Sequence, residues 1–179
     1  RNAQIDTLLA REWLAGNRLG AFASGTVAGC NTRRYHGLLV TATSPPVGRM
    51  MMLSTVMERI ETDRGAYELA TNEFDAVFSP MGVDLLEEFR NDAAVTFVYR
   101  IGDGELVKDI LLAESANAVT LRYTLRGGSG RMILSPFAAL RDYHRLRQAS
   151  PESQMTFKTT ESGAVVQDGA SPTHTLHLM

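Results

Sequence analysis

The chain has 179 residues, of which 44% are hydrophobic, 21% are charged and 15 are glycine. This is the composition of an ordinary globular protein, long enough to bury a core as one domain. Its 18 basic and 20 acidic residues leave a formal net charge of -2, so no net basic field attracts nucleic acid or anionic lipid. We therefore expect neither nucleic acid nor a membrane as a partner.

Cys30 is the single cysteine, so an internal disulfide is excluded and no cysteine pair can share a zinc site with the four histidines. This pattern predicts a reducing compartment, most simply the cytoplasm, and no metal or other cofactor. No apolar run approaches the roughly 20 residues that span a bilayer. The chain begins without methionine and ends on THTLHLM, and we expect it to be a piece of a longer protein.

Helix signals are few: the first dozen residues and the segment ALRDYHRLRQA could each hold one. The glycine-rich stretch GNRLGAFASGTVAG (16–29) follows. It lacks the GK[ST] ending of a phosphate loop, and its glycine spacing does not fit a dinucleotide fingerprint. We interpret it as a loop in which small residues let backbone segments approach closely.

From Tyr35 onward, short apolar or alternating runs are separated by glycine, proline and acidic turns. A hairpin is predicted between residues 95–101 and 105–112, because Gly102, Asp103 and Gly104 permit a tight reversal. A second hairpin is predicted between 119–125 and 131–137 through GGSG. Further strands are expected at 36–43, 49–62, 67–70, 85–90, 155–160, 164–168 and 173–179. Strands at this close spacing favour an all-β antiparallel sandwich or barrel.

Two similar tetrads follow apolar or glycine-rich segments. They are Arg33, Arg34, Tyr35 and His36 in NTRRYHGLLV, and Arg141, Asp142, Tyr143 and His144 after LSPFAAL. If the first tetrad is extended, Arg34 and His36 point one way while Arg33 and Tyr35 point the other. Arginine and histidine offer directed hydrogen bonds and tyrosine offers a flat apolar face, which together suit a sugar. The segment ALRDYHRLRQA is a second candidate for a helix, but it has no clean apolar stripe at helical spacing, so a loop or a single turn is expected equally.

The alternative is that each tetrad closes a strand end by bonding backbone groups and nearby carboxylates. From the residues alone this structural role is favoured over substrate contact. The pair Arg33 and Arg34 nevertheless requires an anionic or strongly accepting partner.

Trp13 lies near Asn17 in REWLAGN, and both are candidates for substrate binding or for a domain interface. A single tryptophan beside a glycine-rich segment is more often a buried anchor than a sugar platform, and we favour the anchor. The acidic pairs 87–88 and 103/105 lie in contexts typical of solvent-facing strands or turns. No carboxylate has a context that singles it out, so no catalytic residue is assigned.

The segment EWLAGNRLGAFASGTVAGCNTRRYHGLLV, followed by PPVGRMMMLS, resembles the amino-terminal domain of bacterial and archaeal glycogen debranching enzymes of the amylo-α-1,6-glucosidase type. Later pieces match in the same order, namely YELATNEF, VYRIGDGELVKDILL, NAVTLRYTL and LSPFAALRDYH. The resemblance implies a super-sandwich of the galactose-mutarotase kind. It also implies a separate α/α toroid that carries the catalytic carboxylates and hydrolyses α-1,6-linked glucose with inversion.

On this basis residues 1–179 are expected to be an N-terminal β-sandwich domain that is inactive alone. Its expected partners are its own C-terminal catalytic domain and glycogen or a related branched α-glucan. Two alternatives stay open: a free-standing glucan-binding module, and a mutarotase-like enzyme that uses His36 or His144 as acid and base.

Overall fold

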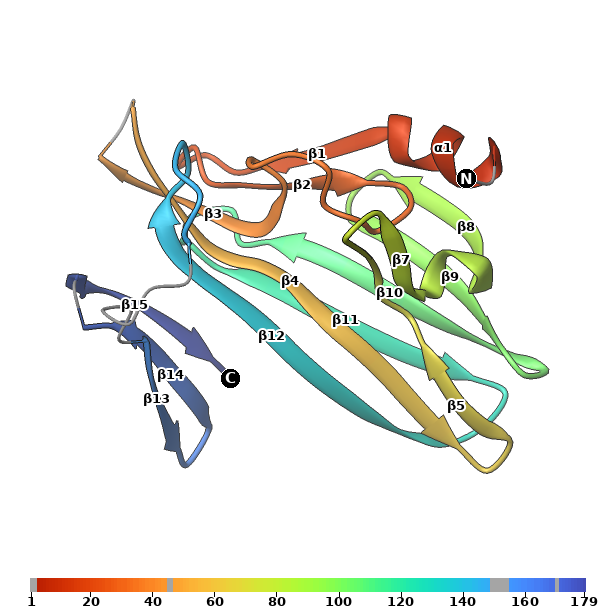
Figure 1. The fold of residues 1–179 in the computed structure, drawn as a ribbon. Coiled ribbons are helices and arrows are strands. Elements are labelled where there is room, and N and C mark those ends of the chain that lie inside the picture. Colours follow the sequence, from red (N-terminus) through yellow and green to blue (C-terminus); the bar gives the residue numbers. More distant parts are fainter. Residues whose placement is uncertain (1–2, 45–46, 149–154, 170) are drawn as a thin grey trace.

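Two antiparallel sheets face each other and form a sandwich in the computed structural model, which describes residues 3–44, 47–148, 155–169 and 171–179 (Figure 1). Strands make up most of the described chain. Only one short α-helix is described, α1 (Ala3–Ala10), and it confirms the helix expected at the start of the chain. The predicted all-β antiparallel sandwich is confirmed.

The larger layer is a six-stranded sheet in the order β1-β2-β3-β4-β12, with β5 paired to β4. Its strands are β1 (Glu12–Gly16), β2 (Phe22–Thr26), β3 (Gly37–Ser44), β4 (Gly48–Thr62), β5 (Gly65–Glu68) and β12 (Gly130–Asp142). The stretch at 16–29, interpreted as a loop, therefore contains β2. The small side chains there do allow close approach, because a Cβ at Gly25 would lie 3.2 Å from the Trp13 ring on β1.

The second layer is a four-stranded sheet in the order β11-β10-β9-β8. Its strands are β8 (Leu86–Asn91), β9 (Val95–Ile101), β10 (Gly104–Leu112) and β11 (Val119–Arg126). The predicted hairpin at 95–112 is confirmed, since β9 and β10 pair from Ile101 and Gly104 onward. Gly102 has a φ of 60° in the turn, a conformation that glycine adopts without strain.

The second predicted hairpin is wrong. Strand β11 pairs with β10 in the four-stranded sheet, whereas β12 pairs with β4 in the six-stranded sheet. The residues 127–129 thus carry the chain from one layer to the other. Alternation in β11 and β12 identified them as strands, but it could not tell which neighbours complete their hydrogen bonds.

Side chains of alternating strand positions fill the space between the layers. Val56 and Ile60 of β4 meet Phe97 and Tyr99 of β9 in one buried cluster. The four side chains are at most 5% exposed, which places the core at the centre of the sandwich.

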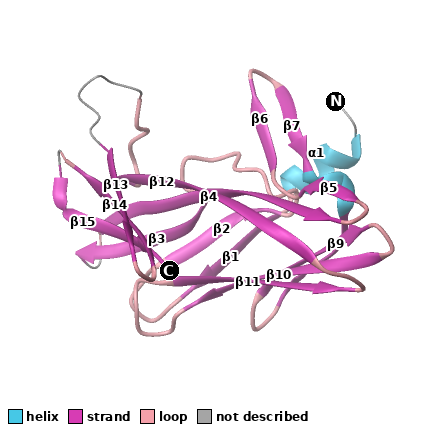
Figure 2. Cartoon of the chain, turned by 90° about the horizontal axis from the view of Figure 1, so that it is seen from below, coloured by secondary structure: helices cyan, strands magenta, loops and turns pink. Residues whose placement is uncertain are grey.

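Smaller elements lie around the sandwich. They are the hairpin β6 (Thr71–Phe74) and β7 (Val77–Met81), the 3₁₀ turn Gly82–Leu85, and a three-stranded sheet of β13 (Met155–Thr160), β14 (Gly163–Asp168) and β15 (Ser171–Leu178). Val166 and Leu176 join the same buried cluster as Leu140, so the small sheet packs on the end of β12. Figure 2 shows the β6–β7 hairpin projecting from the side of the molecule opposite β10 and β11.

Candidate functional site

The two tetrads meet on the surface although their residues are 110 positions apart in sequence. Arg34 donates from Nη1 to the carbonyl oxygen of His144 (3.0 Å), and Arg141 donates from Nη2 to the carbonyl oxygen of Arg34 (2.6 Å). The Tyr35 hydroxyl lies 3.2 Å from Nδ1 of His144. We call Arg34, Tyr35, Arg141, Asp142, Tyr143, His144 and the following Arg145 the tetrad cluster.

Aromatic rings lie side by side in this cluster, next to exposed arginines. The ring centroids of Tyr35 and Tyr143 are 5.3 Å apart, and those of Tyr143 and His144 are 4.0 Å apart. Tyr35 is 38% exposed. The cluster therefore presents flat apolar faces with polar edges at the surface, as the residue types predicted.

Arg141 organises the loop that follows β12. Its Nη1 donates to the carbonyl oxygens of Asp142, Tyr143 and Arg145 at 3.2, 3.2 and 2.7 Å. Partial burial lowers the pKa of Arg141; Asp142 opposes this shift and Arg34 adds to it. These contacts agree with the strand-end role considered for the tetrads, and the segment 143–148 is a loop without a helix.

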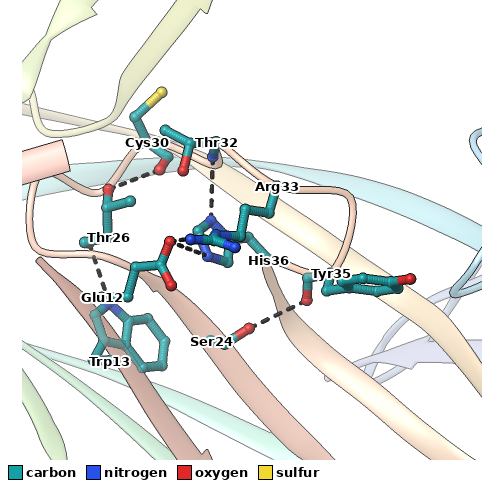
Figure 3. A network of polar contacts seen from close by, with 9 residues as sticks. All are labelled: Glu12, Trp13, Ser24, Thr26, Cys30, Thr32, Arg33, Tyr35 and His36. Carbon is teal, nitrogen blue, oxygen red and sulfur yellow. Dashed lines mark hydrogen bonds and ion pairs between the residues drawn. The ribbon is translucent and has the colours of Figure 1, made fainter. Parts of the chain in front are cut away.

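The predicted alternation of the first tetrad is wrong. The His36 amide donates to the carbonyl oxygen of Arg33 (3.0 Å), so residues 33–36 form a turn and β3 begins only at Gly37. The turn places Arg33 and His36 on one side, facing Glu12 of β1, as Figure 3 shows. Arg34 and Tyr35 contact His144 of the second tetrad.

The arginine pair was predicted to need an anionic partner, and for Arg33 this partner is Glu12. Its Oε1 lies 2.5 Å from Nε of Arg33 and 3.6 Å from Nε2 of His36. Nδ1 of His36 accepts a hydrogen bond from the Thr32 amide, so Nε2 carries the proton and points at the carboxylate. Burial lowers the pKa of His36, although Glu12 opposes this effect, so the ring is neutral at pH 7.

Trp13 and Asn17 lie apart from the tetrad cluster. Trp13 is 6% exposed, and its indole nitrogen donates to the carbonyl oxygen of Thr26 (3.2 Å), as Figure 3 shows. Asn17 donates to the carbonyl oxygens of Ala113 and Ala116 and accepts from two amides of its own turn. Both side chains therefore tie segments of the sandwich together, and the Trp13 ring has no free face for a sugar.

A buried charged group between the sheets was not predicted from the sequence. Glu58 of β4 is 1% exposed, and its Oε1 accepts from Lys108 Nζ (2.6 Å) and from the Tyr123 hydroxyl (2.5 Å). Burial and the nearby Glu58 carboxylate raise the pKa of Tyr99 and of Tyr123, so both phenols stay protonated. A signal was present: Glu58 and Lys108 each occupy a core-facing position between two apolar ones.

The cavity beside this group has a volume of about 30 Å³. That volume holds about two water molecules, whereas small-molecule sites measure roughly 300 Å³ or more. The interior of the sandwich is therefore not a sugar site. The exposed tetrad cluster is the stronger candidate.

Metal and membrane functions find no support in the described part of the chain. Among those residues, no group of three or more His, Cys, Asp and Glu side chains is arranged to hold a metal ion. No described helix has the length and apolar character needed to cross a bilayer.

Comparison with protein families matches residues 11–179 to the family described as Glycogen debranching enzyme N terminal. The chain belongs to this family. The resemblance inferred from EWLAGNRLGAFASGTVAGCNTRRYHGLLV is thereby confirmed. No curated protein and no solved structure gives a significant match to the chain.

The matched residues 11–179 include both tetrads and the strands of both facing sheets. It places the chain at the N-terminal end of glycogen debranching-type enzymes. The family description assigns no role to individual residues.

Proposed function

We propose that the chain is the non-catalytic N-terminal domain of an α-1,6-glucosidase that debranches glycogen, and that it supports a separate catalytic domain and the branched glucan. The observation that carries this proposal is the meeting of the two tetrads in one exposed cluster of tyrosine, histidine and arginine. Aromatic faces beside directed donors suit sugar rings and their hydroxyls.

The proposal leaves hydrolysis to the catalytic domain. Glycoside hydrolysis requires two carboxyl groups that flank the scissile bond, one of them as a general acid. Three carboxylates are buried in the described part of the chain, and each is engaged by the chain itself. Glu58 binds Lys108, Asp109 accepts from Thr96 (2.7 Å) and Arg122 (2.9 Å), and Asp168 accepts from Arg147 (2.6 Å). These contacts support a structural role for the buried acids.

The enzyme that carries this domain provides the first test. Tyr143→Ala removes a ring of the tetrad cluster but leaves the backbone carbonyl that Arg141 binds. We expect a several-fold higher KM for glycogen, little change in kcat, and unchanged kinetics on a minimal substrate with a single branching glucose. The matched control is Tyr67→Ala, since Tyr67 lies on β5 at the opposite end of β4 from the cluster. Equal effects of the two variants, or release of glucose from branched dextrin by the 179-residue chain alone, would refute the proposal.

A free-standing glucan-binding module is the second candidate. The exposure of Tyr35 at 38% favours it, because an accessible ring can act as a platform without help from another domain. Calorimetric titration of the 179-residue chain with maltohexaose and with glycogen separates the two functions. Millimolar or tighter binding by the chain alone supports the module.

The mutarotase alternative is disfavoured by the environment of His36. Its Nδ1 accepts from the Thr32 amide and its Nε2 faces Glu12, so neither nitrogen is directed at a substrate. His144 places Nδ1 against the Tyr35 hydroxyl. Polarimetry of fresh α-glucose with the chain should show no acceleration over buffer.

A further inference from the structure

Most arginines that the structure describes are neutralised by a carboxylate. The ion pairs are Arg18–Glu114, Arg33–Glu12, Arg59–Glu61, Arg64–Asp103, Arg90–Glu88, Arg100–Glu87, Arg122–Asp109, Arg126–Glu105 and Arg147–Asp168. Within the described ranges, no carboxylate lies at ion-pair distance from Arg11, Arg34, Arg131, Arg141 or Arg145. Three of these five, Arg34, Arg141 and Arg145, lie together in the tetrad cluster.

Contacts of Arg141 bring the other two together. Its guanidinium donates to the carbonyl oxygen of Arg34 (2.6 Å) and to that of Arg145 (2.7 Å), so the two exposed side chains start from neighbouring points on the backbone. Asp142 is the one carboxylate in the cluster, and its Oδ1 accepts from the His144 amide. Three positive charges therefore face a single negative one.

This excess charge is unfavourable by itself. Like charges at short range repel, and Arg34 adds to the lowering of the Arg141 pKa that burial begins. Arg141 uses its donors on carbonyl oxygens. Arg34 has one described hydrogen bond, to His144, and the side chain of Arg145 has none among the described residues. Both retain free donors, and both are exposed.

The opposite side of the molecule shows the contrasting arrangement. On the outer face of the four-stranded sheet, Glu87 meets Arg100 and Glu105 meets Arg126 across neighbouring strands. That face is neutralised within the chain. The tetrad cluster instead lies at the end of β12, which pairs with β4 in the six-stranded sheet.

We propose that Arg34 and Arg145 dock an acidic protein surface, and that this surface belongs to the catalytic domain. The assignment of the partner rests on the proposed function; the acidic chemistry rests on the unpaired arginines. A neutral glucan cannot use their charge, whereas carboxylates take the planar guanidinium fork in paired hydrogen bonds. Tyrosine and arginine side by side are typical of the centres of protein interfaces.

The test uses the 179-residue chain and a fluorescein-labelled hexaglutamate peptide as a probe of acidic surface. We expect saturable binding by anisotropy in 20 mM NaCl that weakens strongly in 200 mM NaCl, because exposed charges are screened. Arg34→Ala with Arg145→Ala should raise the Kd roughly tenfold, as two exposed charge pairs are lost. The matched control, Arg100→Ala with Arg126→Ala, removes two charges from the neutralised face and should change the Kd less than about twofold.

Two results would overturn the proposal. They are no saturable binding of hexaglutamate in 20 mM NaCl, or equal weakening of that binding by the two double variants. Failure of the proposed function is a separate outcome, because it is measured with glycogen and the Tyr143→Ala enzyme. Thermal melts of each variant establish that the fold is intact.

Discussion

Replacing Lys108 with methionine tests the buried charged group between the sheets. The variant keeps a side chain of similar length but removes the ammonium group that lies 2.6 Å from Glu58. Glu58 is 1% exposed, so bulk water does not reach its carboxylate, and only the small cavity beside it has room for a water molecule. Only the Tyr123 hydroxyl among the described donors would still reach the carboxylate.

The expected loss follows from these contacts. Removing one partner of a buried ion pair destabilises a protein by about 3–5 kcal/mol, because an uncompensated charge remains in the core. The remaining hydrogen bond from Tyr123 places Lys108→Met near the lower limit, at about 3 kcal/mol. Since domains of this kind are stable by about 5–15 kcal/mol, the loss is a large part of the total. Glu58→Gln combined with Lys108→Met removes both charges and should lie within about 1 kcal/mol of the parent chain.

The assay is urea unfolding at pH 7 followed by fluorescence of Trp13, which lies in the same core. The four chains of the double-mutant cycle should give a coupling energy of at least about 2 kcal/mol between the two positions. Lys158→Met on the exposed strand β13 is the matched control and should change stability by less than about 0.5 kcal/mol. A Lys108→Met chain within about 1 kcal/mol of the parent would refute the reasoning.

Three further predictions concern single positions. The fold lowers the pKa of His36, so the unfolded chain binds more protons than the folded chain below pH 6.5. The free energy of unfolding should therefore fall from pH 7 to pH 5, and it should fall less in His36→Asn. Urea unfolding at each pH measures this difference. Ala76 has a φ of 62°, so Ala76→Gly should stabilise by about 0.5–1 kcal/mol in urea titrations, whereas the control Ala42→Gly in β3 should destabilise. A Cβ at Gly82 would overlap the Leu69 carbonyl group, so Gly82→Ala should cost about 3 kcal/mol or more; a melting temperature equal to that of the parent would contradict this contact.

Local patterns in the sequence predicted the parts of the fold that depend on local physics. The β9–β10 hairpin followed from period-two alternation over 95–101 and the turn residues Gly102, Asp103 and Gly104. The structure confirms it, with β10 beginning one residue earlier than predicted, at Gly104. The strand β4 followed from one long run of strand-forming residues, and it differs from the expected residues 49–62 only by beginning at Gly48. These features can be predicted from sequence because turn-forming residues and the alternation of side chains along a strand depend on only a few neighbouring residues.

Pairing between distant segments could not be read in this way. The short connection 127–129 has the composition of a hairpin turn, yet it joins the two layers. Strand β2 has mostly small side chains, so its hydrophobic period is weak, and it is recognised only by its pairing with β1 and β3.

The candidate site shows the same division. Residue types alone identify the two tetrads and their chemistry. They do not show that residues 33–36 form a turn in place of an extended strand. The turn places Arg33 and His36 on one face, whereas an extended chain predicts Arg34 and His36 together. The contact between Tyr35 and His144 and the pairing of Glu58 with Lys108 both depend on how the sheets are assembled. Charged residues at core-facing strand positions, here Glu58 and Lys108, are the sequence signal that indicates such a buried pair.

The connection between the layers also sets the order in which the sandwich can be completed. Strand β4 pairs with β12 through Thr62 and Gly130, positions roughly 70 residues apart, and contacts at such separation form slowly because a long loop must close first. During synthesis, one edge of β4 stays without its partner until β12 has emerged, whereas β8 to β11 can already assemble as a meander. An open edge of fifteen residues is a template for pairing with other chains, so shortened chains that end before β12 should aggregate. The last strand of the larger sheet thus acts as its closing strand.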